Sequence, residues 1–361
     1  RPPAYDAYQA YGEGVQTYLD DRQHDAAPIF DRAIALDSTF DAAVLWAAHS
    51  HWFTGNDGDA LGARLAILEP RRDRLSRYDR ARMDWIRHFR DGDFDSIYQS
   101  ARRVALAAPG SVNARRELAL AAMRTWRYRE AREIFRELFP PVGLMRSWSQ
   151  AYPYHIELLH LTGRHDEEAE LAREGQQNGQ LDRADALRLR AVAAAGAGDI
   201  ATATRLADSV STGDGVIELV VGRELMGHGS QEAGRALIDR AVPMLEAATA
   251  DPWIPVVLGQ AYYAQGRYDT ARSTLERAEP YWWPQHRTRL AFLIRIATRQ
   301  GDTAAVVRYT REAAERFWWE ADLVTARGTA AAAAQLARKV LLERTWDDTE
   351  PVPLDADVVY T

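Results

Sequence analysis

Residues 251–280 read DPWIPVVLGQAYYAQGRYDTARSTLERAEP, and this stretch decides the fold. It consists of two helix-forming runs separated by a turn at Gly266. Gly259 and Ala271 are small where the two helices would cross, and Ala278 is small where the second helix would meet the next pair. A bulky residue at such a crossing would overpack it, at a cost of roughly 1–3 kcal/mol. We therefore predict a closely packed helical hairpin.

The same register returns on both sides of this stretch, at intervals of roughly 30 to 40 residues. Alanine, leucine, arginine and glutamate dominate in helical runs, and β-branched alternation is almost absent, so the whole chain is predicted to be all-α. Weaker copies of the hairpin include Gly14, Ala26, Phe30 and Ala33, then Leu118, Ala119, Tyr128, Ala131 and Phe135, and the turns at Gly163, Gly198, Gly229 and Gly301.

The hairpin resembles the tetratricopeptide repeat (TPR). The matching residues are Leu258, Gly259, Tyr262, Gly266, Tyr268, Ala271, Leu275 and Ala278, whereas Pro255 departs from the large residue usual at its position. The resemblance implies a right-handed superhelical solenoid of about eight TPR-like helix pairs with a C-terminal capping helix. An irregular helical bundle is the alternative, and residues 148–179 fit it best because they are the least regular.

The domain prediction is one continuous TPR-like solenoid over residues 1–344, followed by an acidic tail over residues 345–361. The tail contains Pro351 and Pro353 and no basic residue, so it should be extended rather than helical. Residues 33–43 and 74–94 also resemble repeat regions that follow the kinase domain of bacterial serine/threonine kinases. The chain contains no Gly-rich nucleotide loop, His-Arg-Asp or Asp-Phe-Gly segment, so that resemblance implies no kinase chemistry.

Composition excludes several classes of protein. The 361 residues carry a net charge of −7 and 27% charged residues, which does not indicate a nucleic-acid partner. The absence of cysteine excludes disulfides, thiol nucleophiles and thiolate metal sites. No apolar run reaches the roughly 18 residues of a membrane span, so we expect a soluble or membrane-extrinsic chain of undecided compartment. The chain begins at Arg1, so an N-terminal signal or anchor is expected to be missing.

The histidines are the main candidates for metal or acid–base chemistry. Residues two or five positions apart on a helix face different sides, whereas a chelating pair needs a separation of three or four. On this basis His49 with His51, and His155, His160 and His165, are not predicted to bind a metal. Glu167 and Glu168 are interpreted as solvated charge. We therefore predict no catalytic site, no metal and no cofactor.

Two surface features are candidates for binding a partner. Trp282, Trp283, Trp318 and Trp319 form two doublets 36 residues apart, and they are predicted either to anchor a partner or to fill the wedge between repeats near the C-terminal end. Residues 71–90 contain eight arginines and three aspartates, a balance of eight minus three, or +5. Of these, Arg71, Arg72, Arg74 and Arg77 are predicted to dock an acidic protein surface or lipid headgroups. The favoured alternative is local pairing between arginine and aspartate.

These observations predict a non-enzymatic scaffold or accessory subunit that holds partner proteins of a larger complex. The tryptophan doublets, the arginine cluster and the N-terminus extend this prediction to peripheral contact with a membrane or membrane protein. The alternative prediction is the sensory or regulatory TPR region of a bacterial signalling protein, such as a kinase or a transcriptional regulator, which binds a peptide or small ligand.

Overall fold

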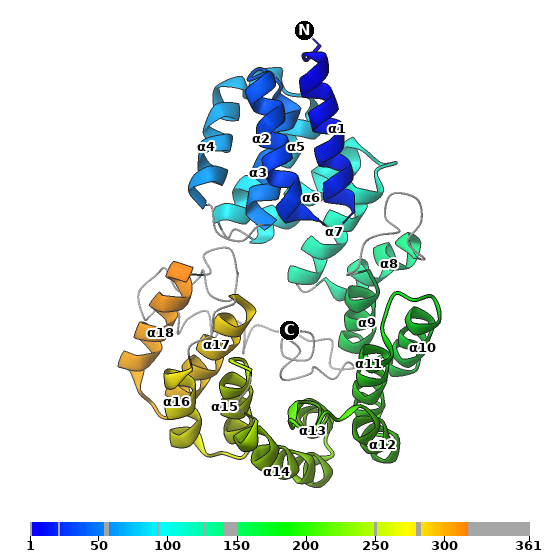
Figure 1. Ribbon diagram of the computed structural model, residues 1–361, viewed down its shortest axis with the longest axis vertical. Helices are drawn as coiled ribbons and strands as arrows, with labels where there is room; N and C mark the ends of the chain where they lie inside the picture. The colour runs from blue at the N-terminus through cyan, green and yellow to red at the C-terminus, as the bar shows by residue number, and fades with distance from the viewer. Residues whose placement is uncertain are drawn as a thin grey trace. The chain divides into compact units, whose positions relative to one another are not determined.

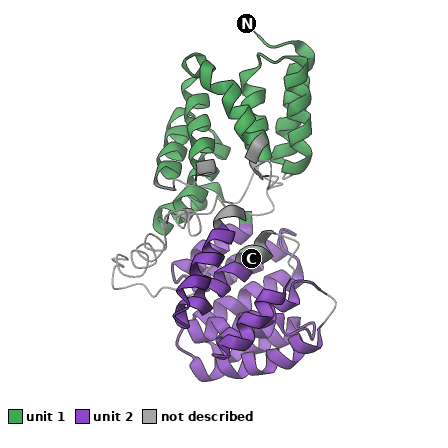
Figure 2. Cartoon of the chain, turned by 90° about the vertical axis from the view of Figure 1, so that its left-hand side faces the viewer, with its two compact units in different colours: residues 1–151 green, residues 152–361 purple. Residues whose placement is uncertain are grey.

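The computed structural model describes residues 2–20, 22–53, 58–91, 94–125, 127–139, 151–248, 251–278 and 283–316. These residues form two compact units, Arg1–Ala151 and Tyr152–Thr361 (Figure 2). The single domain predicted over residues 1–344 stays a prediction. The predicted acidic tail, residues 345–361, lies outside the described residues.

Unit 1 is a series of helical hairpins in which each helix packs on the next along the chain, and α1 and α3 also pack on the following odd-numbered helix (Figure 1). Its elements are α1 (Tyr5–Leu19), α2 (Gln23–Leu36), α3 (Asp41–Phe53), α4 (Gly58–Leu68), the 3₁₀ helix η1 (Glu69–Arg74), α5 (Arg77–Asp91), α6 (Phe94–Ala107), α7 (Val112–Arg124) and α8 (Tyr128–Leu138).

Unit 2 begins within α9 and repeats the hairpin plan. Helices α11, α13 and α15 each pack on the next odd-numbered helix, up to α17, as well as on their own partner, so these helices form an inner layer, and the even-numbered helices form an outer layer (Figure 1). Its helices are α9 (Ala151–Leu161), α10 (His165–Gln177), α11 (Arg183–Gly196), α12 (Ile200–Val210), α13 (Val216–Gly227), α14 (Gln231–Ala247), α15 (Ile254–Ala264), α16 (Tyr268–Arg277), α17 (Trp283–Arg299) and α18 (Thr303–Arg316).

The predicted all-α class is confirmed. The described residues contain eighteen α-helices arranged as nine sequential TPR-like pairs, where the sequence predicts about eight.

A glycine with positive φ closes the first helix of each pair in unit 2, and it sets a common register. These glycines are Gly163, Gly198, Gly229, Gly266 and Gly301, with φ between 68° and 91°. The left-handed conformation suits glycine because it has no Cβ. Five positions later a buried residue lies at the helix crossing in the first four pairs. These residues are Glu168, Ala203, Gly234 and Ala271.

The helices approach closely where the sequence predicts it. A Cβ atom on Gly259 would lie 2.5 Å from Cγ of Leu275, which is itself fully buried. In the preceding pair a Cβ on Gly234 would lie 2.4 Å from the carbonyl oxygen of Gly222 and 2.9 Å from the backbone nitrogen of Met226. Backbone atoms cannot move aside as a side chain can, so α13 and α14 depend on this glycine most strictly.

Replacing Gly234 with alanine should therefore destabilise unit 2, by about 1–3 kcal/mol through overpacking. The matched control is Gly227→Ala in the same hairpin, where a Cβ would meet no atom within 4 Å. That control should be neutral or stabilising by up to about 1 kcal/mol, because alanine is the better helix former. Urea unfolding of both variants measures the difference, and equal midpoints would contradict the close crossing.

Candidate functional sites

Three of the four predicted tryptophans, Trp282, Trp318 and Trp319, lie outside the described residues. Trp283 begins α17. The aromatic surface that these residues would form stays a prediction.

The arginines of η1 form ion pairs within unit 1. Arg71 donates from Nη1 to Oδ1 of Asp41 over 2.9 Å and to the carbonyl oxygen of Ser38 over 3.0 Å. Arg74 donates from Nε to Oδ2 of the same Asp41 over 3.0 Å. Both arginines therefore tie η1 to the start of α3, 30 or more residues earlier in the chain.

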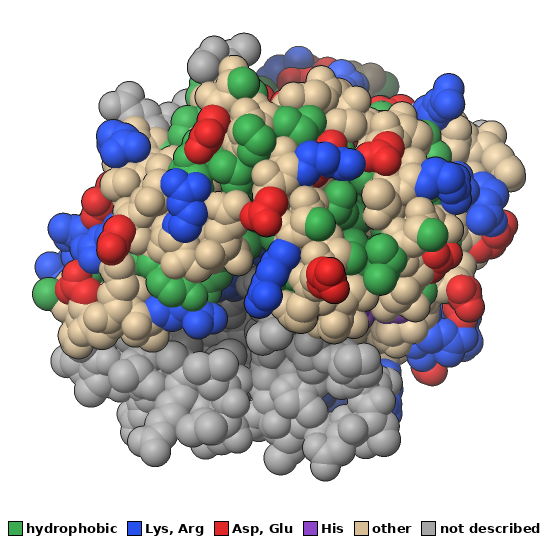
Figure 3. All heavy atoms as spheres, turned by 90° about the horizontal axis from the view of Figure 1, so that it is seen from below, with side chains coloured by type: hydrophobic (Ala, Val, Ile, Leu, Met, Phe, Trp, Pro, Cys, Tyr) green, Lys and Arg blue, Asp and Glu red, His purple; other side chains and the backbone are tan. Residues whose placement is uncertain are grey.

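Arg72 makes a bidentate ion pair with Asp84 of α5, in which Nη1 donates to Oδ1 over 2.7 Å and Nη2 donates to Oδ2 over 2.9 Å. Arg77 is exposed at the start of α5. Three of the four predicted arginines thus pair with aspartates, as the local-pairing interpretation expects, and docking on an acidic surface stays a prediction. Elsewhere, too, charges of opposite sign are interspersed, as on the face in Figure 3.

A buried polar network centred on Arg82 crosses the odd-numbered helices of unit 1. The Arg82 guanidinium is 0% exposed and lies over the ring of Trp46, 4.1 Å from its centroid. It donates to Tyr78 Oη over 2.8 Å and to Nδ1 of His49, and it lies 3.4 Å from Oε1 of Glu117. The pair with Glu117 compensates a charge that would be very unfavourable to bury alone.

The tautomer of His49 follows from this arrangement. A guanidinium can only donate, so Nδ1 of His49 accepts, and the proton of the neutral ring lies on Nε2. That nitrogen is 3.3 Å from Tyr18 Oη and 3.9 Å from Oε1 of Glu117. Burial, followed by the positive charges of Arg82 and Arg116, lowers the pKa of His49 well below its usual value. His49 is therefore neutral in the folded chain.

The inner layer of unit 2 brings arginines and aromatic rings together from three successive pairs. Arg223 of α13 donates to Gln260 of α15 over 2.8 Å, and its guanidinium lies 5.3 Å from the ring centroid of Phe292 in α17. Arg299 of α17 donates to Tyr263 Oη over 2.9 Å, and the rings of Tyr263 and Phe292 meet edge to face at 5.2 Å. These contacts hold both guanidinium groups in place.

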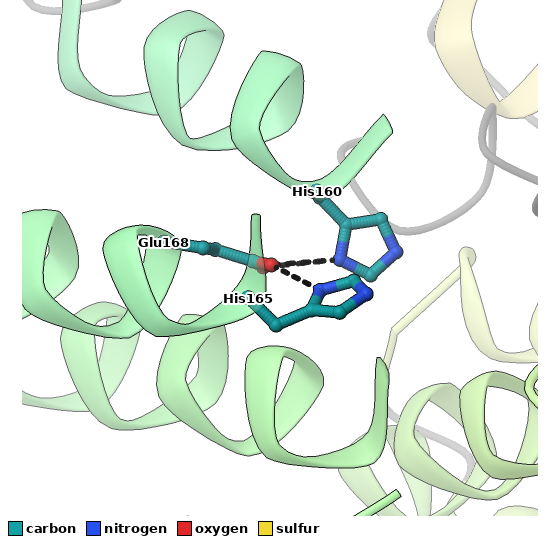
Figure 4. A group of neighbouring side chains, drawn as sticks. All are labelled: His160, His165 and Glu168. Carbon is teal, nitrogen blue, oxygen red and sulfur yellow. Dashed lines mark hydrogen bonds and ion pairs between the residues drawn. The ribbon is translucent and has the colours of Figure 1, made fainter. Parts of the chain in front are cut away.

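A cluster of histidines and glutamates in unit 2 lies around the turn that connects α9 to α10. His160 is in the last turn of α9, and His165 and Glu168 are in the first turn of α10. Both imidazoles turn toward the Glu168 carboxylate (Figure 4), with Nδ1 of His160 and Nδ1 of His165 each 3.0 Å from Oε2 of Glu168. The interpretation of Glu168 as solvated charge was wrong, because this side chain is 0% exposed.

Glu224 of α13 and His228, the residue that follows α13, complete the His–Glu cluster, which we define as His160, His165, Glu168, Glu224 and His228. Oε1 of Glu224 is 2.9 Å from Nε2 of His160 and 2.9 Å from Nε2 of His228. The cluster therefore joins the α9–α10 pair to the α13–α14 pair.

The carboxylates hold His160 in its charged form. Burial alone would lower the pKa of His160, but Glu168 and Glu224 outweigh burial and raise it to about 10. Burial alone would raise the pKa of Glu224, but its bonds to His160 and His228 lower it to about 2. The buried positive charge of His160 thus lies between two carboxylates, which compensate it.

The sequence analysis missed this cluster because it used a spacing rule that holds only for residues on one continuous helix, whereas a turn separates His160 from His165. His160 and His165 are on different helices, so a separation of five places them on facing sides of the turn at Gly163. A usable signal existed in the glycine register. Glu168 falls where later pairs have Ala203, Gly234 and Ala271, and Glu224 falls where the next pair has Ala261.

Comparisons with known proteins give a fold likeness only. A tetratricopeptide repeat protein from Parabacteroides merdae is 14% identical and covers 72% of this chain and 99% of its own, with a TM-score of 0.39. Yeast Tom70 is 11% identical, and the match covers 94% of this chain and 98% of the Tom70 chain, with a TM-score of 0.38. A structure of the Cut9–Hcn1 hetero-tetramer of APC/C is 13% identical and covers 90% and 62%, with a TM-score of 0.34.

No family model matches the chain, and no curated protein sequence does. TM-scores below 0.5 are too low to carry a partner or an activity over to this chain. The finer resemblance to kinase-associated repeats stays a prediction. Among the described residues, every helix is too short or too polar to cross a membrane.

Removing the charge of Glu117 should strongly destabilise unit 1, because Arg82 would remain buried without its carboxylate. We expect Glu117→Gln to lower the free energy of unfolding of unit 1 by about 3–5 kcal/mol. The matched control is Glu137→Gln, which removes a carboxylate that is 65% exposed and pairs with Arg115, and it should cost less than about 1 kcal/mol. Urea unfolding monitored by tryptophan fluorescence tests this, and similar losses in both variants would contradict the buried pair.

His49 should make unit 1 less stable in mild acid. Its folded pKa lies below the unfolded value, so only the unfolded chain takes up a proton as the pH falls through about 6.5. The contribution of His49 to the free energy of unfolding should fall by about 1.4 kcal/mol per pH unit between pH 6 and pH 5. The variant His49→Gln should lack this pH dependence. His160 contributes little to that slope, because its raised pKa keeps it protonated in the folded chain and the unfolded chain has already taken up most of this proton at about pH 6. Equal slopes for the two proteins would contradict the neutral, buried imidazole.

Proposed function

We propose that this chain is a non-enzymatic scaffold that binds other proteins along the inner layer of unit 2. The observation that carries the proposal is the set of guanidinium groups and aromatic rings that three successive inner helices bring together, Arg223, Tyr263, Phe292 and Arg299. Arginine and aromatic residues are enriched among the residues that dominate protein–protein binding. A TPR-like array also places such residues on neighbouring pairs at regular intervals.

The chemistry of this surface favours a partner segment with carboxylate groups. Guanidinium groups bind carboxylates through two parallel hydrogen bonds, and groups already held in place lose less freedom on binding. The ring of Tyr263 would contact the apolar parts of the same segment, and the buried ring of Phe292 packs against Tyr263.

The finer proposal is that the chain acts as an accessory subunit of a larger, membrane-associated complex. It is supported by the scaffold chemistry above and by the two tryptophan doublets of the sequence. The test is affinity purification of the tagged full-length protein from its own cells in mild detergent, with mass spectrometry of the co-purifying proteins. Stoichiometric recovery with membrane-complex subunits supports it, whereas recovery of the chain alone would favour the regulatory TPR region of a signalling protein.

Neutralising the inner arginines should weaken capture of the recovered partner. We expect the double variant Arg223→Gln, Arg299→Gln to lower the affinity at least about tenfold, because each such residue contributes on the order of 1–2 kcal/mol. The matched control is Arg235→Gln, Arg311→Gln, which removes the same charge from exposed positions on the outer helices α14 and α18. Biolayer interferometry with the purified partner measures both, and equal affinities would place the binding surface elsewhere.

A further inference from the structure

The side chains of the His–Glu cluster have the composition of a divalent metal site. Two imidazole nitrogens and one carboxylate oxygen come from a single hairpin, namely Nδ1 of His160, Nδ1 of His165 and an oxygen of Glu168. These atoms all lie within 4.8 Å of one another, and all three residues are buried. Histidine nitrogen and carboxylate oxygen are ligands of zinc and related divalent ions, and three protein ligands leave a fourth position open.

The spacing between these atoms also suits an ion. Two ligands bound to zinc at about 2.0–2.1 Å in tetrahedral geometry lie roughly 3.4 Å apart. Each Nδ1 lies 3.0 Å from Oε2 of Glu168 (Figure 4), so small side-chain movements would open the centre of the triad to a metal. The exchange replaces the hydrogen bonds of the two Nδ1 atoms with metal bonds, and the displaced protons leave to solvent.

The surroundings of the triad are those expected of ligands held in place. Ligating histidines usually donate a hydrogen bond from the N–H group of the other ring nitrogen to a carboxylate, which fixes the ring orientation and the tautomer. Nε2 of His160 has such a partner in Glu224, 2.9 Å away, and Glu224 in turn contacts His228. On the other side, Gly196 at the end of α11 leaves room for His165, because a Cβ there would lie 2.5 Å from Cε1 of the imidazole.

Stability alone gives no reason for this arrangement. Buried ion pairs contribute little compared with apolar residues of the same size, and replacing them is often neutral or stabilising. The equivalent crossing positions in the next three pairs have Ala203, Gly234 and Ala271, so the repeat packs without a carboxylate there.

We propose that His160, His165 and Glu168 bind a divalent transition-metal ion of the zinc class, with Glu224 as the residue that orients His160. The site links the turn ends of α9 and α10 to α13. It is independent of the scaffold proposal, since it uses different residues and a different ligand.

The first test is metal binding by the full-length chain after removal of any histidine tag and dialysis against EDTA. Titration with ZnCl₂ in a calorimeter should give one equivalent per chain with a Kd below about 1 µM. CoCl₂ should produce visible absorption bands of a cobalt ion with nitrogen and oxygen ligands. Zinc at a hundredfold excess over Kd should raise the thermal midpoint by about 5–10 °C.

Variants then assign the ligands. His165→Gln and Glu168→Gln should each weaken zinc binding at least about 100-fold, and Glu224→Gln should weaken it by about 10- to 100-fold. Gly196→Ala keeps every ligand but crowds His165, so it should also weaken binding. The matched controls are His51→Gln, which removes a histidine of unit 1, and Glu167→Gln, which removes an exposed carboxylate beside Glu168. Both should bind zinc as the unaltered chain does.

Several results would overturn the proposal. If the unaltered chain shows no saturable zinc binding and no cobalt spectrum, the His–Glu cluster is an ion-pair network only. If it binds zinc but His165→Gln and Glu168→Gln bind equally well, the metal is held elsewhere. Circular dichroism establishes that each variant is folded, and His165→Gln, which keeps the buried carboxylate, assigns the site even if Glu168→Gln fails to fold.

Discussion

The close crossing of two helices at a residue with little or no side chain is the constraint on which the rest of unit 2 depends. A left-handed glycine ends the first helix, and five positions later the second helix passes under it at Ala203, Gly234 or Ala271. This separation lets Leu275 and its counterparts fill the space between helices without strain. Because the pairs of unit 2 end their first helix at equivalent glycines, the first helices line up as an inner layer, and side chains from different pairs can meet there.

Both units use their odd-numbered helices to assemble buried polar groups that no single helix could satisfy. In unit 1 the guanidinium of Arg82 has partners on α3 and α7 as well as on its own helix. In unit 2 His160 lies between carboxylates of α10 and α13. A buried charge is tolerable only when its partners are in place. These clusters therefore require the correct stacking of pairs that are distant in the sequence, and they penalise alternatives in which one pair is displaced.

The sequence predicts the fold well because hairpin signals are local. Gly259, Ala271 and Leu275 lie within 17 residues, and their spacing alone indicates two crossing helices. The His–Glu cluster could not be found in that way, since His160 and Glu224 are 64 residues apart and on helices of different pairs. The pairing of Arg74 with Asp41, 33 residues away, escaped for the same reason. Spacing rules for side chains hold along one continuous helix and fail at a turn, which is where His160, His165 and Glu168 lie.

The His–Glu cluster also changes how unit 2 should respond to a bound partner. In a simple repeat array each pair contacts only its neighbours, so the array bends easily. The contact between His160 and Glu224 links the α9–α10 pair to the α13–α14 pair and bypasses α11–α12. Such a link restrains bending over three consecutive pairs, and one of the linked helices, α13, holds Arg223. A stiffer inner layer loses less conformational entropy when a partner binds. The cluster can thus raise affinity without contacting the partner, and a metal ion in it would strengthen that restraint.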